Sequence, residues 1–335
     1  MRDLGGGSTT VTSPTHTDDR LPDLHRLETG LTVALAAAGQ PHGQVSVLAR
    51  ETPVHTTTFP NEVLTCTLPD GRIAQLFSKY EAGHDHNAFG HRSGVTYEAD
   101  VYRQVLDRLP LSRLTWYGSF LDRTTDNTWL FVEYAANSVP LHEATDPAAM
   151  SLAAGWIGSF HAANESRLWD ASLAFLNRYD AAYYRGWSRR TVAYAHPLLD
   201  QFPWLTALCE RFESYATQLE SWPQAVLHGE YYPQNLLYRD AQVYPVDWES
   251  AAIGLGEIDL ASLTERWPAE TVAQCERAYR DARWPDGTPE TFEKALAAAR
   301  LYWQFRWLGD RPEWTAGETW RFHELLGPAE RLGLL

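Results

Sequence analysis

A short stretch in the second half of the chain carries residue types and a spacing that suit phosphoryl transfer. Residues 226–237 read VLHGEYYPQNLL, in which Glu230 precedes Asn235, and Asp247 follows in PVDWE. Phosphoryl transfer needs cations that hold the phosphates, oxygen ligands for Mg²⁺ and a carboxylate that orients the acceptor hydroxyl. We therefore predict that these three residues are catalytic, with Glu230 as the carboxylate and Asn235 and Asp247 as the Mg²⁺ ligands.

Two residues earlier in the chain fit the phosphate end of such a site. Lys79 ends the strand-like run RIAQLFSKY, and Glu98 lies further on in a helical stretch. Lys79 can reach the α and β phosphates of a nucleotide, and Glu98 can hold it as an ion pair. The plainer alternatives are a surface lysine and a solvated glutamate. Asp247 lies among apolar residues, where a buried carboxylate without a cation is costly, although a structural hydrogen bond is the alternative.

Two polar connections are candidates for contact with the phosphates. The connection ETPVHTTTFP offers Thr56, Thr57 and Thr58 but has no glycine, and a plain polar turn is the alternative. The loop GHDHNAFGHRSG lies between Lys79 and Glu98 and offers Arg92, whose guanidinium suits a phosphate group. The alternative for this loop is a solvated surface insertion. Its histidines match no zinc-ligand spacing, so we expect no zinc site there.

The elements that position these residues change character along the chain. Leucines at helical spacing predict a helix over Leu24–Ala38 that ends at Gly39, and three strands follow, the last two joined by a hairpin turn at 69–71. A helix over Val95–Leu109 and the strands LTWYGSFL and TWLFVEY complete this part. From Pro147 long helices predominate, interrupted by short strands in AVLHG, NLLYRD and QVYPVDW. The aromatic run YWQFRW is predicted to be core, with a substrate wall as the alternative. The pattern predicts two lobes with a cleft between them.

The composition narrows the partners and the compartment. The 335 residues carry a formal net charge of -15, which disfavours a nucleic acid or an anionic membrane and fits a cationic ligand. The three cysteines show no ligand pattern, and no apolar run resembles a signal peptide or a membrane span. These features predict a cytoplasmic protein. Residues 1–22 are rich in Gly, Ser, Thr and Pro and are predicted to be a flexible tail.

The motifs together resemble those of the aminoglycoside phosphotransferase and choline kinase-like family, which shares the bilobal protein-kinase fold. The resemblance runs from about Val45 to Leu263 and rests on seven motifs in order, LFSKY, YEADVY, LFVEY, GSFHAAN, HGEYYPQN, VDWES and GEIDLASL. It implies an α+β fold with two lobes. The N-terminal lobe (23–135) would hold an antiparallel five-stranded sheet with one inserted helix. The larger, mainly helical C-terminal lobe (136–335) would hold the catalytic loop, the metal site and the acceptor site.

The resemblance also implies a role for each matching residue on the nucleotide side. Lys79 and Glu98 match the ion pair that positions the nucleotide. The backbone of Glu133, Tyr134 and Ala135 matches the hinge that hydrogen-bonds adenine. The expected cofactors are ATP or GTP with Mg²⁺.

On the catalytic side, Asn235 and Asp247 match the metal ligands, and His228 and Asp259 match residues that brace the loop. Glu230 stands at the position of the catalytic acid, where the family usually has aspartate. The extra methylene moves the carboxylate by about 1 Å or more, a displacement that can cost on the order of a hundredfold in rate. An altered loop at Tyr231-Tyr232-Pro233 could compensate.

The resulting expectation is a phosphotransferase that acts on a hydroxyl of a small molecule, such as an aminoglycoside or another amino alcohol, in antibiotic resistance or biosynthesis. Glu249, Glu257 and Glu265 lie where the acceptor pocket of the family opens, and they either hold a cationic substrate or are solvated surface residues. Two alternatives stay open. One is a natural-product pathway kinase that phosphorylates Ser or Thr of a precursor peptide. The other is a pseudokinase-like binding protein, which Glu230 and the missing glycine-rich turn favour.

Overall fold

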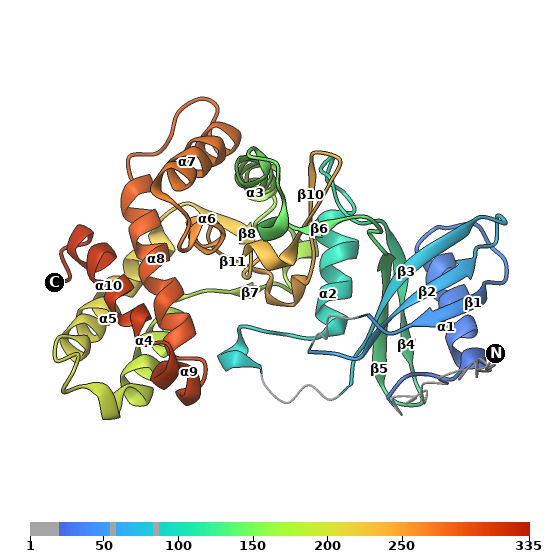
Figure 1. Ribbon diagram of the computed structural model, residues 1–335, viewed down its shortest axis with the longest axis horizontal. Helices are drawn as coiled ribbons and strands as arrows, with labels where there is room; N and C mark the ends of the chain where they lie inside the picture. Colours follow the sequence, from blue (N-terminus) through green and yellow to red (C-terminus); the bar gives the residue numbers. More distant parts are fainter. Residues whose placement is uncertain (1–19, 54–57, 83–86) are drawn as a thin grey trace, which may run out of the picture.

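Two lobes lie side by side in the computed structural model, which describes residues 20–53, 58–82 and 87–335 (Figure 1). The first lobe is built around a sheet, and the second consists mostly of helices. The α+β, two-lobed fold predicted from the sequence is therefore confirmed. Most of the predicted tail, residues 1–19, lies outside the described residues.

The N-terminal lobe contains a five-stranded sheet in which all neighbouring strands are antiparallel, in the order β1-β2-β3-β5-β4. The strands are β1 (Ser46–Glu51), β2 (Asn61–Thr67), β3 (Ile73–Tyr80), β4 (Trp116–Asp122) and β5 (Asn127–Glu133). The predicted hairpin joins β2 to β3, and Gly71 supplies the positive φ of +83° that its turn requires. Lys79 is the second-last residue of β3.

Helix α1 (Leu24–Ala37) covers one face of this sheet. Asp23 caps its first turn by accepting a hydrogen bond from the backbone N–H of Arg26 at 2.9 Å. Its buried leucines, Leu27, Leu31 and Leu35, form a small core with side chains of the sheet. This core fastens the helix to one face of the sheet and leaves the other face toward the second lobe.

Helix α2 (Val95–Val101) follows β3 and continues as a π-helical turn over Tyr102–Leu106. The predicted helix thus ends three residues earlier than Leu109. The buried side chains of α2 belong to the same apolar core as the C-terminal lobe rather than to the core under α1. Because α2 packs against the second lobe, it fixes Glu98 relative to the catalytic segments.

The C-terminal lobe consists of eight helices and six short strands among the residues described. The helices are α3 (Ala149–Glu165), α4 (Ala181–Tyr194), α5 (Leu205–Ser221), α6 (Glu257–Thr264), α7 (Ala269–Arg283), α8 (Phe292–Leu308), α9 (Pro312–Gly317) and α10 (Trp320–Arg331). The strands are β6 (Val139–Pro140), β7 (Asn177–Arg178), β8 (Gln224–Leu227), β9 (Leu236–Arg239), β10 (Gln242–Pro245) and β11 (Ala252–Leu255).

The short strands carry the catalytic segments. Residues 228–235 connect β8 to β9, and Asp247 lies between β10 and β11. β8 pairs with β11 and β9 pairs with β10, so both ends of the two connections are tied by backbone hydrogen bonds. The two connections therefore lie beside each other at the face of the lobe that meets α2.

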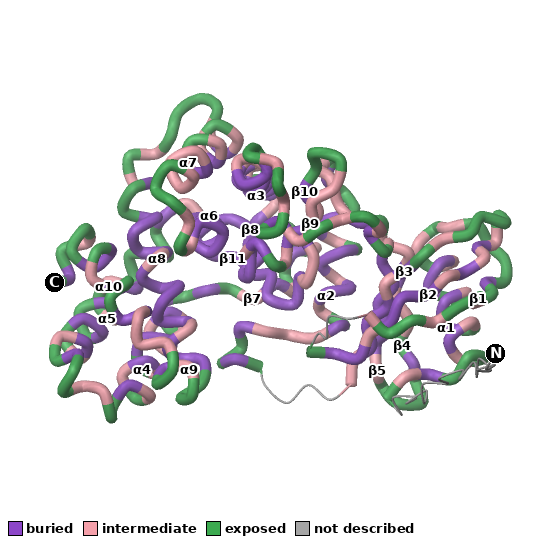
Figure 2. The backbone as a smooth tube through the Cα atoms, viewed as in Figure 1, coloured by how far each residue is buried: buried purple, intermediate pink, exposed green. Residues whose placement is uncertain are grey.

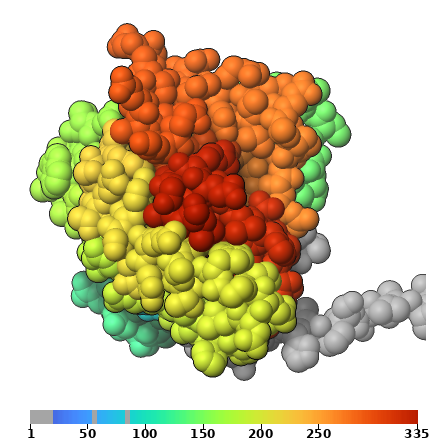
Figure 3. Space-filling view, turned by 90° about the vertical axis from the view of Figure 1, so that its left-hand side faces the viewer, coloured from blue at the N-terminus to red at the C-terminus, as the bar shows by residue number. Residues whose placement is uncertain are grey.

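Helix α8 runs through the middle of the C-terminal lobe and is buried along most of its length (Figure 2). Seen from the C-terminal end, α10 lies between α7 on one side and α5 on the other (Figure 3). Tyr302, Trp303 and Phe305 of α8 are buried, which confirms the core prediction for these members of YWQFRW. No helix among the described residues is both long and apolar enough to cross a membrane.

Candidate active site

The catalytic loop begins at the end of β8, where a single carboxylate fixes its backbone. Asp259 of α6 accepts hydrogen bonds from the backbone N–H groups of His228 at 2.8 Å and Gly229 at 2.9 Å. The His228 imidazole donates from Nε2 to the carbonyl of Val246 at 2.9 Å, which ties the loop to the segment that carries Asp247. The bracing contacts predicted for His228 and Asp259 are therefore present.

Gly229 makes this close arrangement possible. Its φ of +86° is a conformation that residues with a Cβ rarely adopt, and a Cβ there would lie 2.1 Å from the carbonyl oxygen of Ser250. Glycine is thus the residue that lets the catalytic loop approach the segment after Asp247.

A second layer holds Asp259 itself. His161 of α3 lies with Nε2 3.1 Å from Asp259 Oδ2, and its Nδ1 is 3.0 Å from the hydroxyl of Tyr279. Burial lowers the pKa of His161 to about 4, and the nearby Arg283 acts in the same direction. The imidazole is therefore neutral at physiological pH. His161 belongs to the motif GSFHAAN, but the sequence assigned it no role.

Lys79 makes the ion pair predicted for it and a second one. Its Nζ lies 2.8 Å from Glu98 Oε2 and 2.6 Å from Asp247 Oδ1, and the lysine is only 4% exposed. Burial opposes protonation, but the carboxylates of Asp247 and Glu98 raise the pKa of Lys79 well above its usual value. Glu98 also accepts a hydrogen bond from the backbone N–H of Trp248 at 3.1 Å. Lys79, Glu98 and Asp247 thus form one network across the two lobes.

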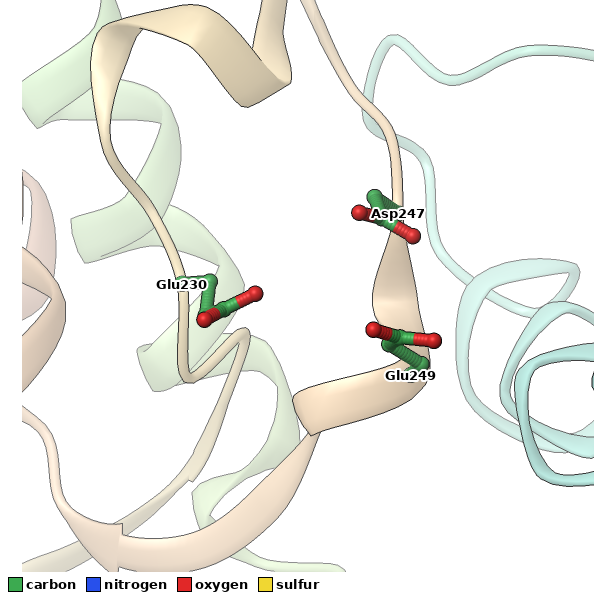
Figure 4. Close-up of side chains that lie close together, drawn as sticks. All are labelled: Glu230, Asp247 and Glu249. Atoms are coloured by element: carbon green, nitrogen blue, oxygen red, sulfur yellow. The ribbon is translucent and has the colours of Figure 1, made fainter. Parts of the chain in front are cut away.

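Three carboxylates face one another beside this network. Glu230, Asp247 and Glu249 each place an oxygen within 4.8 Å of the others (Figure 4). Burial and the neighbouring charge of Asp247 raise the pKa of Glu249 to about 8, and its Oε2 is buried without a hydrogen-bond partner among the described residues. Asp247 adopts a left-handed backbone conformation, with φ of 65°, a strain typical of functional sites. A divalent cation would relieve this crowding of negative charge, so the oxygen donors fit Mg²⁺.

Asn235 lies at the end of the catalytic loop, where its side-chain amide donates to the carbonyl of Glu230 at 3.2 Å. This bond uses the nitrogen of the amide, so the oxygen is left for another partner. The backbone N–H of Val246 donates to the Asn235 carbonyl at 2.9 Å, which places Asn235 next to the Asp247 segment. Its assignment as a metal ligand stays a prediction.

Glu230 is buried, with 1% exposure, between cations. Its Oε1 accepts a hydrogen bond from Arg92 Nη2 at 3.0 Å and another from Arg306 Nη2, while His91 Nε2 is 3.6 Å away. Burial alone would raise the pKa of Glu230, but Arg306, His91 and Arg92 bring it well below the usual value. The carboxylate is therefore ionised at physiological pH and is a weak base, better suited to orienting a hydroxyl than to removing its proton completely.

Comparison with known proteins identifies the group to which the chain belongs. The model of a phosphotransferase enzyme family matches residues 93–326, a segment that contains Glu98, both catalytic connections and Arg306. The chain belongs to the phosphotransferase enzyme family. No curated protein sequence matches it.

Solved structures with the same fold include three phosphotransferases that are named for different substrates. A point mutant of aminoglycoside 2′-phosphotransferase IIIa, in complex with GDP, is 15% identical, with a TM-score of 0.57 over 93% of this chain and 97% of that one. Choline kinase LicA from Streptococcus pneumoniae is 16% identical, with a TM-score of 0.54 over 86% and 94%. Macrolide 2′-phosphotransferase MphH from Brachybacterium faecium is 17% identical, with a TM-score of 0.51 over 91% and 98%. At these identities the likeness concerns the fold.

In this phosphotransferase the loop between Lys79 and Glu98 reaches across to the C-terminal lobe. Within the described part of the loop, Ala88 and His91 are buried, and His91 Nδ1 is 2.9 Å from the hydroxyl of Tyr183 on α4. Residues 88 and 91–94 are therefore packed against the protein, whereas Asn87, Phe89 and Gly90 are exposed, as the alternative of a solvated insertion expects. The structure places Arg92 at Glu230 rather than beside Lys79, and its contact with phosphate stays a prediction. Residues 83–86 lie outside the described part of the chain.

The other candidate for phosphate contact, the connection between β1 and β2, is only partly described. Thr56 and Thr57 lie outside the described residues, and Thr58 is exposed. Phe59 is buried beyond them, and its ring centroid is 5.3 Å from Lys79 Nζ. An aromatic ring from this connection therefore covers the lysine.

The hinge segment lies where β5 ends. The Tyr134 N–H donates to the carbonyl of Gln75 at 3.0 Å, and the Glu133 side chain binds Arg239 at 3.0 Å. The backbone of Ala135 accepts a hydrogen bond from Ser138 Oγ at 2.7 Å. Several polar groups of the hinge are thus already paired, and the contact of Glu133, Tyr134 and Ala135 with adenine stays a prediction.

Two of the three acidic residues considered for a cationic substrate or for the solvated surface are held in ion pairs outside the carboxylate cluster at the catalytic site. Glu257 is buried and bound to Arg283 at 3.0 Å, and Glu265 is bound to Arg321 at 2.7 Å. Glu249 is the exception, since it faces the catalytic site. Arg306 carries no role in the predictions from sequence, although an arginine inside the largely aromatic run YWQFRW is a signal of a buried ion pair.

Proposed function

We propose that the protein transfers the γ-phosphate of ATP or GTP, with Mg²⁺, to a hydroxyl of a small molecule such as an aminoglycoside or another amino alcohol. One observation carries the proposal. Lys79, Glu98 and Asp247 from both lobes form one network, and the carboxylates of Glu230 and Glu249 lie next to it. A cation for phosphates, oxygen ligands for Mg²⁺ and a carboxylate for the acceptor thus meet in one small region.

Each of these residues has a separate task in the proposed reaction. Lys79, held by Glu98, binds the phosphates, and it pairs with one oxygen, Oδ1, of the Asp247 carboxylate. Asn235, Asp247 and Glu249 would hold Mg²⁺ through their oxygens, and the ion would supply positive charge that neutralises the phosphates. Glu230 accepts a hydrogen bond from the acceptor hydroxyl and aims its oxygen at the γ-phosphorus. Similar proteins support the nucleotide, since LicA and an aminoglycoside phosphotransferase form complexes with AMP and GDP.

The acceptor has to fit between cationic and aromatic groups on the Glu230 side. Arg92 and Arg306 repel an ammonium group at that point, so the amino groups of an amino alcohol must bind further from Glu230. A cavity of about 600 Å³ lies among α6, α7, α8 and α10, and Trp303 lines it. The Trp303 ring is 6.5 Å from the ring of Tyr232 in the catalytic loop. No residue of the catalytic loop (228–235) lines this cavity, and Trp303 connects the two. A cavity of this size suits a small molecule rather than a long peptide.

The two arginines bound to Glu230 also favour a second candidate, a pseudokinase-like binding protein. A carboxylate that is fixed by two arginines resembles a structural ion pair as much as a catalytic group. The complete set of Lys79, Glu98, Asn235 and Asp247 argues against this candidate, because a pure binding protein needs no metal ligands. Nucleotide binding alone would not separate the two, whereas turnover would.

The test is calorimetric titration with ATP and with GTP, with and without MgCl₂, followed by a screen of hydroxyl acceptors for nucleotide turnover. Wild type is compared with Asp247→Ala and with Asp286→Ala, which removes an exposed aspartate as the control. We expect Mg²⁺-dependent binding in wild type and the control but not in Asp247→Ala, and turnover with a small hydroxyl compound. Absence of nucleotide binding under every condition would refute the proposal, and binding without any turnover would favour the pseudokinase.

A further inference from the structure

The extra methylene of Glu230 raises the question of what holds its carboxylate in place. Both of its arginine ion pairs end on Oε1, one from Arg92 and one from Arg306. No described residue makes a hydrogen bond to Oε2. The two arginines therefore hold the carboxylate by one oxygen, and one oxygen of Glu230 is directed toward Asp247 and Glu249 (Figure 4). The loop Tyr231-Tyr232-Pro233, which the sequence pointed to, makes no hydrogen bond to this carboxylate in the described structure.

Arg306 is the more rigid of the two partners. It is 0% exposed in the last turn of α8, and its guanidinium carbon lies 5.4 Å and 4.7 Å from the ring centroids of Trp303 and Trp307. Its Nε and Nη1 have no hydrogen-bond partner among the described residues, so Glu230 is its single hydrogen-bond partner there. A buried guanidinium with one carboxylate depends on that carboxylate. Arg92 is more exposed and also lies 3.7 Å from Glu249.

The length of the side chain at position 230 decides whether its ion pair with Arg306 forms. An aspartate at position 230 would end about 1.5 Å shorter, one carbon–carbon bond. At that length its carboxylate would lose the contact with Arg306, whose guanidinium lies close to the two tryptophan rings. The glutamate thus matches an arginine whose position in the core is fixed.

We propose that Arg306 is the positioning residue of the catalytic carboxylate, and that it makes glutamate, rather than aspartate, the working residue at position 230. This inference rests on the proposed phosphotransfer. Arg306 binds Oε1 of Glu230, which leaves Oε2 to accept a hydrogen bond from the acceptor hydroxyl. In this way it compensates for the extra methylene of Glu230, which would otherwise displace the carboxylate. Lysine cannot replace it fully, because an ammonium group lacks the planar fork that lies close to both rings.

The experiment measures kcat and KM for Arg306→Met, Arg306→Lys and Glu230→Asp with the acceptor found by the screen, and nucleotide hydrolysis with water as acceptor if the screen finds none. Calorimetry with nucleotide and Mg²⁺ is run on each variant. We expect nucleotide affinity and KM within about threefold of wild type, and kcat about a hundredfold lower in Arg306→Met and Glu230→Asp. Arg306→Lys should recover part of the loss.

Two controls separate positioning from general damage. Arg50→Met removes the arginine that binds the buried Glu62 on the α1 side of the sheet, with distances of 2.7 Å and 2.8 Å, and should lower the melting temperature without lowering kcat. Glu230→Asp keeps the charge and both arginines, so it stays informative if Arg306→Met fails to fold.

The outcomes distinguish this inference from the proposed function. A wild type that binds no nucleotide overturns both. If wild type turns over and Glu230→Asp is as fast or faster, aspartate is the better residue and this inference alone is wrong. The same holds if folded Arg306→Met keeps the wild-type kcat.

Discussion

The two sides of the catalytic site hold buried charge in opposite ways. On the phosphate side one cation, Lys79, lies between two carboxylates. On the acceptor side one carboxylate, Glu230, lies between two guanidinium groups. The pKa of Lys79 is raised by its partners and that of Glu230 is lowered by its own, so both groups stay charged despite burial. The phosphate side therefore carries excess negative charge and the acceptor side excess positive charge. A metal ion, a nucleotide or an acceptor of opposite charge can balance each of them.

The opposite charge around Lys79 and around Glu230 suits the two substrates of the proposed reaction, the nucleotide and the acceptor. Surplus carboxylate oxygens next to Lys79 suit Mg²⁺, which binds few protein ligands together with phosphate oxygens. Surplus guanidinium groups next to Glu230 suit the negative charge of a phosphoryl group that arrives at the acceptor. In the proposed reaction, this arrangement puts the nucleotide phosphates at Asp247 and the acceptor at Glu230.

Removal of the central cation should have the largest effect. Lys79→Met keeps much of the side-chain volume but leaves Glu98 and Asp247 without their shared partner. We expect turnover to fall roughly 100- to 1,000-fold, the size seen when one donor to a developing charge is lost. Steady-state kinetics at saturating nucleotide measure it, and Lys294→Met, at an exposed lysine, is the control. A Lys79→Met enzyme that keeps most of the wild-type kcat would contradict the comparison.

The backbone under the acceptor side can be tested with two glycines of similar conformation. Gly229 has φ of +86° and no room for a Cβ, whereas Gly39 has φ of +74° and no atom within 4 Å of a Cβ. Gly39→Ala should lower the free energy of unfolding by about 1 kcal/mol from backbone strain alone. Gly229→Ala should lower it by about 3 kcal/mol or more, because the carbonyl of Ser250 must also move.

Chemical denaturation of both variants measures this difference, and kcat gives a second readout. Only Gly229→Ala should also reduce turnover, since it displaces the catalytic loop. Equal losses of stability in the two variants would show that the loop relaxes around a Cβ. In that case the close approach is not what fixes Glu230.

Lys79, Glu98 and Asp247 could be predicted from the sequence because each lies in a recognisable local motif. A lysine at a strand end, a glutamate on the next helix and an aspartate in an apolar segment each carry their own signal. The two-lobed fold followed from periodicity and turns in the same way. The strands around PVDWE could also be placed, since short alternating runs flank the catalytic segments.

The partners of Glu230 could not be predicted from local patterns. Arg92 lies 138 residues before it and Arg306 lies 76 residues after it. Arg92 was assigned to phosphate because its loop lies next to Lys79 in sequence, but the loop crosses to α4 through His91. Arg306 was hidden in an aromatic run whose periodicity indicates core. Contacts between distant segments depend on how the helices pack, and the sequence of one chain does not give that packing.

His161, which contacts Asp259 beneath the catalytic loop, should make the free energy of unfolding depend on pH. His161 faces Asp259, Tyr279 and Arg283, and burial holds its pKa at about 4, below the value of about 6.5 in an unfolded chain. The unfolded state therefore takes up a proton first, so stability falls as pH drops from about 6.5 to about 4. For His161 alone this loss is about 2 kcal/mol by pH 5.

His161→Gln removes this titration, so the difference in unfolding free energy between pH 7 and pH 5 should shrink by about 2 kcal/mol. Denaturant unfolding at several pH values measures the slope, and the exposed His142→Gln is the control. Absolute stability of His161→Gln at pH 7 also changes, because its contact with Asp259 is altered. For this reason the test compares how the unfolding free energy changes with pH, not its absolute value at pH 7. A slope equal to that of wild type would show that His161 does not stay neutral in the fold.

The smallest expected effect tests whether Lys79 needs both of its carboxylates. Glu98→Gln keeps the shape of the side chain and can still accept the bond from Trp248, but it removes one charge beside Lys79. The lysine then binds Asp247 alone and competes more strongly with Mg²⁺ for it. We expect kcat/KM for the nucleotide to fall about tenfold, with a higher Mg²⁺ requirement. Asp100→Asn, on the same helix but paired with Arg103 at the surface, should leave both unchanged. If Glu98→Gln behaved like Asp100→Asn, Asp247 alone would position the lysine, and each side of the site would depend on a single dominant partner.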